Sequence, residues 1–323
     1  MGEKLNIVKA LNKALEEELE RDEDVLVMGE DVGVDGGVFR VTEGLYDKFG
    51  EERVIDTPLS ESGIVSTAYG MAVYGMKPVA EIQFMGFSYP AFDQIISHIS
   101  RIRNRSREVY NAGMVIRMPY GGGIQAPEHH SESTEALYAH TPGLKVVIPS
   151  NPDDAYRLLK ASIRDEDPVI FLEPKKIYRS FKQEVEVGEV GELEKARIAK
   201  EGEDVTVVSY GASFREAKKA AEDLDSIDVE LIDLRTIKPM DFETIKESVD
   251  KTGRCIIVHE APQTCGVGAE ISARLTEDDI LHLKAPVKRV TGFDTIIPMY
   301  QMEDKYLPDK SKVKDAVKKV YEF

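Results

Sequence analysis

Two hydrophobic periodicities alternate along the first 175 residues. Leucine and valine recur every three or four positions at the start, which predicts an amphipathic helix over residues 5–20. Short apolar runs follow, each of a length typical of a buried strand, at 24–29, 53–56, 78–84, 113–118, 144–149 and 168–173. Helical patterns are found between them at 62–74, 91–110 and 151–164. Strands that alternate with helices in this way indicate a parallel sheet covered on both faces.

A second series of the same kind begins after residue 200. Apolar strands are predicted at 204–209, 229–234, 254–258 and 287–291, and helices at 213–224, 241–252, 267–277 and 311–321. Residues 175–200 are charged and poorly periodic, which is typical of a connection between domains. We therefore predict an α/β protein with a first domain over 1–185, a linker over 186–200 and a smaller α/β domain over 201–323.

Charge and composition narrow the classes of function. The 323 residues carry a formal net charge of −17, which argues against nucleic acid or an anionic membrane as the partner. No apolar run approaches the ~20 residues of a membrane-spanning helix, and the first residues do not resemble a signal peptide, so we expect a cytoplasmic protein. Of the two cysteines, Cys255 lies in an apolar run and is expected in the core, without a disulfide.

The stretch 56–64, Asp-Thr-Pro-Leu-Ser-Glu-Ser-Gly-Ile, connects a predicted strand to a helix rich in alanine and glycine. Ser60 is a suitable N-cap, and Glu61 comes at the first turn. A carboxylate there usually stabilises the helix dipole. The small residues of the helix and the apolar strand at 78–84 instead favour a buried Glu61, whose raised pKa would suit proton exchange.

Other loops carry candidate chemistry. The acidic loop that begins at Glu30 and Asp31 fits no metal-binding spacing and is expected to be flexible. Aromatic residues around Phe87 suit either core packing or a wall that stacks against a flat heterocycle. The glycines at 121–123 lack the residues of a phosphate-binding loop and indicate a turn that another part of the molecule approaches closely. The histidines at 129–130 fit no metal motif, and a loop histidine near a pocket is a candidate for proton transfer.

Several long motifs in fixed order carry a resemblance to a known family. They are the 56–64 stretch, Ala-Glu-Ile-Gln-Phe at 80–84, Pro-Ala-Phe-Asp-Gln at 90–94, His-Thr-Pro-Gly-Leu-Lys-Val-Val-Ile-Pro at 140–149 and Thr-Gly-Phe-Asp-Thr-Ile-Ile-Pro at 291–298. Over essentially its whole length, the chain resembles the beta subunit of the thiamine-diphosphate-dependent, decarboxylating component of 2-oxo acid dehydrogenase complexes. The pyruvate, branched-chain and acetoin types share this architecture, in which a pyrimidine-binding domain precedes a transketolase C-terminal-like domain.

The resemblance implies roles for individual residues. Glu61 matches the carboxylate that hydrogen-bonds the cofactor's aminopyrimidine and thereby promotes loss of the proton at carbon 2 of the thiazolium. The residues that match the lining of the pyrimidine ring are Leu59, Gln83, Phe84 and Phe87, and many relatives carry tyrosine in place of the last. His130 matches an active-site histidine that assists transfer of the intermediate to lipoamide, although His129 is adjacent and the assignment between the two stays open.

The resemblance also implies partners. A Gly-Asp-Gly motif followed by Asn usually holds magnesium and diphosphate in this class of enzyme, and the chain has only Val-Asp-Gly-Gly at 34–37. The metal and diphosphate ligands are therefore expected on an alpha subunit, in a tetramer of two alpha and two beta chains. The peripheral-subunit-binding and lipoyl domains of a dihydrolipoyl acyltransferase core are expected to bind as well, with Asp294 and Phe323 at the contact positions.

The resemblance bears on three further points. No side chain of this chain is assigned to a metal, but backbone oxygens over 113–167 hold a structural potassium ion in some relatives. A self-sufficient transketolase-type homodimer is disfavoured by the missing Gly-Asp-Gly motif and the short length. A catalytically lapsed interaction subunit is disfavoured because Glu61, Gln83 and His130 are all retained.

Overall fold

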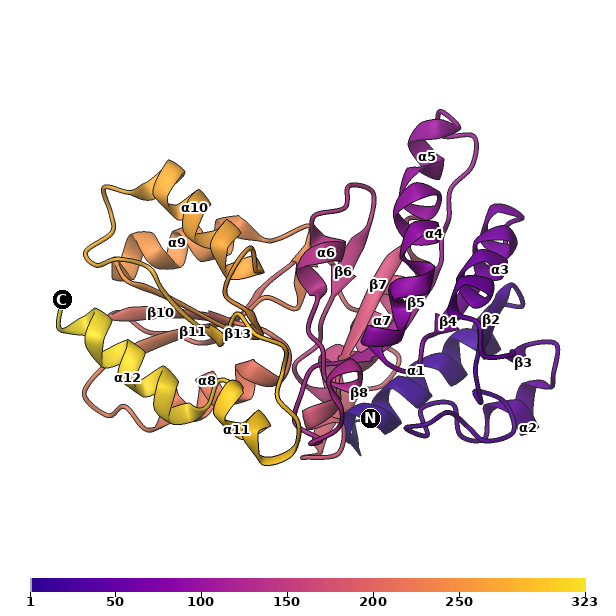
Figure 1. Ribbon diagram of the computed structural model, residues 1–323, viewed down its shortest axis with the longest axis horizontal. Helices are drawn as coiled ribbons and strands as arrows, with labels where there is room; N and C mark the ends of the chain where they lie inside the picture. The colour runs from indigo at the N-terminus through magenta and orange to yellow at the C-terminus, as the bar shows by residue number, and fades with distance from the viewer. Residues whose placement is uncertain (1) are drawn as a thin grey trace.

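In the computed structural model, which describes residues 2–323, two α/β domains lie side by side (Figure 1). The sheet of the first domain has the order β12-β6-β7-β5-β4-β2-β3. Its strands are β2 (Val25–Gly29), β3 (Val54–Asp56), β4 (Lys77–Glu81), β5 (Val115–Tyr120), β6 (Lys145–Val147), β7 (Val169–Pro174) and β12 (Thr236–Lys238). All neighbours in this sheet are parallel except β12 and β6. The predicted α/β class with mostly parallel sheets is confirmed.

Helices cover both faces of this sheet because alternate strand residues point to opposite sides. Val25, Val27 and Val79 pack with α1 (Ile7–Arg21) and α7 (Pro152–Arg164), whereas Leu26 and Met28 belong to the cluster around α3 (Glu61–Val73). Asn6 and Asn151 cap α1 and α7, since their side chains accept hydrogen bonds from the main-chain N–H groups of the third residue on. The shorter helices of this domain are α2 (Leu45–Phe49), α4 (Phe92–Ser97), α5 (Ile102–Arg105) and α6 (Glu135–Ala139).

The second domain is built around a sheet of order β14-β13-β10-β11-β9. Its strands are β9 (Arg197–Lys200), β10 (Val205–Ser209), β11 (Val229–Asp233), β13 (Cys255–Pro262) and β14 (Lys288–Gly292). Its helices are α8 (Gly211–Glu222), α9 (Phe242–Thr252), α10 (Val267–Asp279), α11 (Glu303–Tyr306) and α12 (Lys310–Tyr321). Buried residues of α9 and α10 join the cluster that also contains the α3 face of the first sheet, so one apolar core continues between the domains.

The structure departs from the predicted elements at the edges of the sheets. β1 (Gly2–Leu5) pairs with β8 (Gln183–Glu186), and the stretch predicted as a linker ends in β9, which pairs with β11. β12 comes from the second half of the chain and completes the first sheet. Each of these short strands pairs antiparallel with its neighbour and carries polar residues. They therefore lack the continuous apolar run that is typical of a buried parallel strand.

The single helix predicted over 91–110 is instead divided into α4, a 3₁₀ turn and α5. His98 has φ −122° and ψ −63°, which ends α4. Arginine side chains bind the carbonyls freed at the break: Arg101 Nε donates to Ile96 O at 2.8 Å, and Arg105 Nη2 donates to Ser97 O at 2.8 Å. In the sequence, the arginines of this segment predict a solvated or interface face of one long helix; two of them instead satisfy main-chain acceptors. No helix among the described residues is long and apolar enough to cross a bilayer.

Candidate functional site

The predicted site residues follow the carboxyl ends of adjacent parallel strands. In the ladder, Gly29 of β2 is opposite Asp56 of β3 on one side and Glu81 of β4 on the other. The three strands therefore end at the same edge, and the segments that begin at Glu30, Thr57 and Ile82 leave the sheet together. Ligands of parallel α/β sheets commonly bind at this edge.

Glu61 is the first residue of α3, and the Ser60 side chain caps the helix by accepting from Gly63 N at 3.4 Å. The N-cap prediction is confirmed. The prediction that Glu61 is buried is wrong for the single chain, because its side chain is only partly covered. Leu59, which lies in the loop before Glu61 and is predicted to line the cofactor, is 71% exposed.

Glu30 and Asp31, predicted from the sequence only as the start of a flexible loop, lie close to Glu61 and Gln83. Burial, together with the nearby carboxylates of Asp31 and Glu61, raises the pKa of Glu30. Asp31 Oδ2 accepts a hydrogen bond from Gln83 Nε2 at 3.2 Å. Glu61, Gln83 and the start of the acidic loop therefore form one polar group at the sheet edge. The signal available in the sequence was that Glu30 and Asp31 come directly after a buried strand.

The acidic loop is held in place, contrary to the prediction that it is flexible. The Asp56 carboxylate accepts from Gly33 N at 2.6 Å and from Val34 N at 3.2 Å. The Thr42 hydroxyl donates to Val32 O at 2.6 Å, and this side chain is fully buried. These hydrogen bonds supply the main-chain partners that a flexible loop would take from water.

An aromatic group adjoins the polar one, because Phe84 is next to Gln83 in the chain. The ring centroids of Phe84 and Phe87 are 5.3 Å apart, and His130 packs edge to face on both, at 4.5 Å and 5.0 Å. His129 instead is exposed and packs near Tyr89 at 6.1 Å. The structure thus places His130, rather than His129, with the residues predicted to contact a ring. Within residues 2–323, the buried Nδ1 atom of His130 has no hydrogen-bond partner.

A buried ion cluster lies below the site. The Arg117 guanidinium on β5 is fully buried; it donates to Glu81 Oε2 at 2.7 Å and to Glu173 Oε1 at 2.6 Å. The Tyr178 hydroxyl also donates to Glu173. Burial raises the pKa of the Glu81 carboxyl, and the positive charge of Arg117 opposes this shift. The three charged residues lie on β4, β5 and β7. Glu81 is the last residue of β4, so the cluster lies directly before the segment that carries Gln83 and Phe84.

Comparison with known proteins identifies the family. Residues 3–180 match the model of the transketolase pyrimidine binding domain, and residues 194–313 match that of the transketolase C-terminal domain. The chain is 52% identical to the pyruvate dehydrogenase E1 component subunit beta of Staphylococcus epidermidis (strain ATCC 35984), over 99% of both chains. It is 51% identical to that of Staphylococcus aureus (strain Mu50), again over 99% of both. The chain belongs to the transketolase-like family of E1 beta subunits.

The fold comparison agrees with this assignment. A solved structure described as a split gene transketolase, inactive beta4 tetramer, has a TM-score of 0.80 and 23% identity, with 99% of each chain covered. At this identity the match establishes the shared fold.

The residues predicted to bind the acyltransferase lie on the surface of the second domain of this E1 beta family member. Asp294 is exposed and accepts hydrogen bonds from Thr264 N at 2.8 Å and Thr264 Oγ1 at 2.7 Å, which lower the pKa of its carboxyl. Phe323, the last residue, is 78% exposed. Both side chains are thus accessible to a partner.

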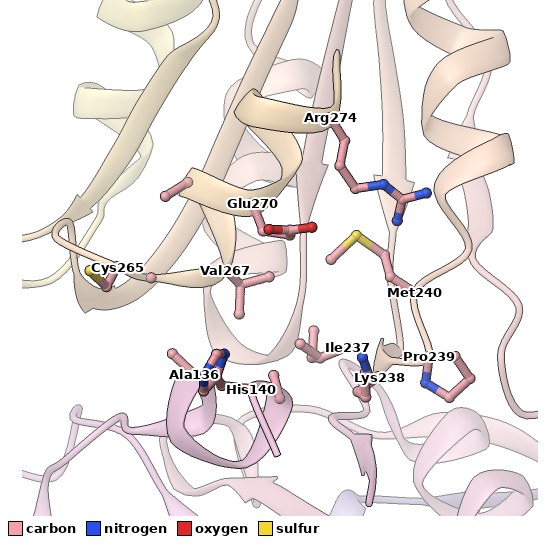
Figure 2. Close-up of a pocket in the computed structure, with 13 residues that line it drawn as sticks. Ala136, His140, Ile237, Lys238, Pro239, Met240, Cys265, Val267, Glu270 and Arg274 are labelled. Atoms are coloured by element: carbon pink, nitrogen blue, oxygen red, sulfur yellow. The ribbon is translucent and has the colours of Figure 1, made fainter. Parts of the chain in front are cut away.

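A cavity of about 620 Å³ lies at the junction of the two domains. Figure 2 shows Glu270 and Arg274 of α10 above it, and His140 and Lys238 below. None of the residues predicted for cofactor binding or catalysis lines this cavity. The site around Glu61 and His130 is therefore a separate feature on the open edge of the first sheet.

Proposed function

We propose that this chain is the beta subunit of a pyruvate-specific, thiamine-diphosphate-dependent 2-oxo acid dehydrogenase that acylates lipoamide. The relatives named pyruvate dehydrogenase, 51–52% identical over nearly the full length, favour pyruvate over branched-chain 2-oxo acids and acetoin. The observation that carries the proposal is the grouping of Glu61, Gln83, Phe84, Phe87 and His130 at one edge of the pyrimidine-domain sheet.

Glu61 is proposed to hold a proton at a ring nitrogen of the cofactor, which when bound supplies the electron sink for decarboxylation. The Ser60 cap holds the start of α3, where Glu61 lies, and the partial exposure of the Glu61 side chain allows it to reach a ring. Its neighbour Glu30 already has a raised pKa. Covering this edge with a second chain would remove water from the acidic group, and low polarity favours the protonated form of a carboxyl.

Phe84 and Phe87 are proposed to contact the pyrimidine ring, with Leu59 completing the wall when a partner covers it. His130 is held edge to face against both phenylalanines, and these contacts orient its ring at the aromatic group. We assign to it the handling of the acyl group on its way to lipoamide. A positioned histidine is a common proton donor or acceptor at neutral pH.

An alpha subunit is proposed to supply the ligands of magnesium and of the diphosphate, in a tetramer of two alpha and two beta chains. The sheet edge carries carboxylates at Glu30, Asp31, Asp56 and Glu61, and these would repel a diphosphate. The exposure of Leu59 fits a surface that another chain covers. A structural potassium ion bound by main-chain oxygens of 113–167 belongs to the same proposal.

The acyltransferase core is proposed to bind the second domain at Asp294 and Phe323. A small basic domain would suit an acidic surface, and the chain has a net charge of −17. A carboxylate that two hydrogen bonds hold in one orientation is suited to pairing with a cation.

The test is reconstitution. The purified chain is mixed with its candidate alpha partner, thiamine diphosphate and magnesium, and the reduction of an artificial acceptor is followed with pyruvate, a branched-chain 2-oxo acid or acetoin. We expect activity only from the mixture, with pyruvate preferred. Activity of this chain alone would refute the divided site, and an inactive mixture that still assembles would favour a lapsed interaction subunit.

Glu61→Gln in the assembled enzyme should lower turnover by about a hundredfold or more, because an amide cannot exchange the proton. Glu243→Gln is the matched control: it also removes a carboxylate from the first turn of a helix, but in the second domain. Both variants should lose a similar helix-dipole contribution of about 0.3–1 kcal/mol, so their free energies of unfolding should be similar. Near-normal turnover of Glu61→Gln would contradict the assigned role.

A further inference from the structure

The loop that carries His130 runs from the end of β5 to α6 and is closed at its base. Gly121 N donates to Glu132 O at 2.9 Å, so residues 121–132 form a compact loop. The His130 ring lies inside this span and contacts Phe84 and Phe87. The position of His130 therefore depends on what fixes the main chain of the loop.

Two carboxylates of the second domain bind successive parts of this loop. Glu260 on β13 accepts from Gly122 N at 3.1 Å, and Glu303 at the start of α11 accepts from Gln125 N at 2.9 Å. Both side chains are almost completely buried, at 4% and 1% exposure. Hydrogen bonds from main-chain N–H groups to buried carboxylates are among the stronger contacts in proteins.

A cation of the first domain completes the arrangement. Lys175, which follows β7 and is buried, donates from Nζ to Gly121 O at 2.5 Å. Charged side chains therefore hold three main-chain groups of the loop, at Gly121, Gly122 and Gln125. Loops are more often held by water and by their own side chains.

The glycines of the loop are explained by the same contacts. Gly121 has φ +80°, and a Cβ atom there would collide with the carboxylate of Glu260. A Cβ atom on Gly122 would lie 2.9 Å from Glu303 Oε1. The sequence predicts that another part of the molecule comes close to the glycine turn at 121–123. The structure shows that the carboxylates of Glu260 and Glu303 do so.

The acceptor oxygen matters more here than a full negative charge. Burial raises the pKa of Glu260 to about 7 and lowers that of Lys175 to about 7, so each neutral form is accessible near neutral pH. Glu303 Oε1 has no hydrogen-bond partner within residues 2–323, so only one of its two oxygens is used. A glutamine at 303 can keep the contact with Gln125 N through its carbonyl oxygen.

We infer that the second domain positions His130 for acyl transfer, with Glu260 and Glu303 as positioning residues that hold the main chain of the 121–132 loop. The inference rests on the proposed function for the role of His130. The two hydrogen bonds from Gly122 N to Glu260 and from Gln125 N to Glu303, which we call the clamp, do not depend on that role. A purely structural contact between the domains would lower stability without favouring one half-reaction over the other.

The test compares Glu303→Ala with Glu303→Gln in the enzyme assembled with its alpha partner. Asp304→Ala is the matched control, because it removes an exposed carboxylate from the adjacent position of α11. The readout is the kcat for acylation of a lipoyl domain divided by the kcat for decarboxylation with an artificial acceptor. We expect this ratio to fall about tenfold in Glu303→Ala, since a misplaced group costs this much or more. Glu303→Gln and Asp304→Ala should stay near the parent value.

Hydrogen exchange of the peptide containing residues 121–126, in the same complexes, gives a readout independent of activity. Exchange should be faster in Glu303→Ala only. Unchanged exchange would show that Glu303 does not hold the loop, and faster exchange with an unchanged ratio would show that the loop does not position His130; either result overturns the inference. If His130→Ala itself leaves the ratio unchanged, the proposed role of His130 fails, whereas the exchange data still decide whether the clamp exists.

Discussion

The buried Arg117 offers the sharpest test of how the first sheet supports the site. Its guanidinium has no exposed surface and neutralises Glu81 and Glu173, which are also buried. Arg117→Met keeps most of the volume but leaves both carboxyls without a cation. Removal of one partner from a buried ion pair costs about 3–5 kcal/mol of the free energy of unfolding. We therefore expect the melting temperature to fall by about 10 °C.

A surface arginine with a similar pattern of contacts is the control. Arg103 Nε lies 2.6 Å from Asp167 Oδ1 and Arg103 Nη2 lies 3.4 Å from Glu166 Oε2, but all three side chains are exposed to solvent. Arg103→Met should therefore cost no more than about 1 kcal/mol. The difference between the two variants isolates the effect of burial, because both remove an arginine that contacts two carboxylates.

Two further measurements separate charge from packing. When Glu81→Gln and Glu173→Gln are added to Arg117→Met, much of the lost stability should return, because no uncompensated charge remains in the core. Burial raises the pKa of Glu81, and loss of the Arg117 charge that opposes this shift raises it further. Protonation then neutralises this carboxyl as the pH falls, so the deficit relative to the parent protein should be larger at pH 8 than at pH 5. Chemical unfolding from pH 5 to 8 measures both effects, and a loss in Arg117→Met no greater than that in Arg103→Met would refute the reasoning.

Two other predictions concern histidines. His130→Ala should lower acylation of a lipoyl domain by about a hundredfold and decarboxylation much less, with His129→Ala near normal; equal losses in both half-reactions would contradict the assignment. Burial, and secondarily the positive charge of Arg289, lower the pKa of His259 to about 4. The unfolded chain therefore binds the extra proton between about pH 6.5 and 4, and stability should fall by about 3 kcal/mol as the pH falls through this range. His259→Gln should lose that part of the pH dependence in urea unfolding, and identical slopes for variant and parent would show that His259 does not titrate in this way.

The alternation of buried strands and amphipathic helices could be predicted because both are local patterns. A parallel strand covered on both faces is apolar throughout, as in β2, and α1 shows its core face every three to four residues. β12 could not be predicted this way: three residues of the second half of the chain pair with β6, and only the tertiary structure brings them there. The break at His98 was equally hidden, because the arginines that satisfy the freed carbonyls look like a solvated face in the sequence.

The same distinction applies to the site. Glu61 was recognisable because a capping serine, a helix start and a strand end are adjacent in the sequence. Its degree of burial was not, because burial depends on which segments pack over this end of the sheet, and within residues 2–323 Glu61 stays only partly covered and Leu59 stays exposed. For Glu30 and Asp31 the local signal was an acidic pair after a buried strand, and only the parallel pairing of β2 and β4 brings Gln83 to it.

The 121–132 loop that carries His130 depends on contacts with residues far away in the sequence. The three glycines at 121–123 predict a close approach, and the structure confirms it. The groups that make the approach, Glu260 and Glu303, are 138 and 178 residues away from their partners in the sequence. The acidic half of the site is therefore assembled within the first 83 residues, whereas the loop that carries His130 is also bound by carboxylates of the second domain. Two halves held by different parts of the fold can be altered separately, which is why substitutions at Glu61 and at Glu303 should affect different half-reactions.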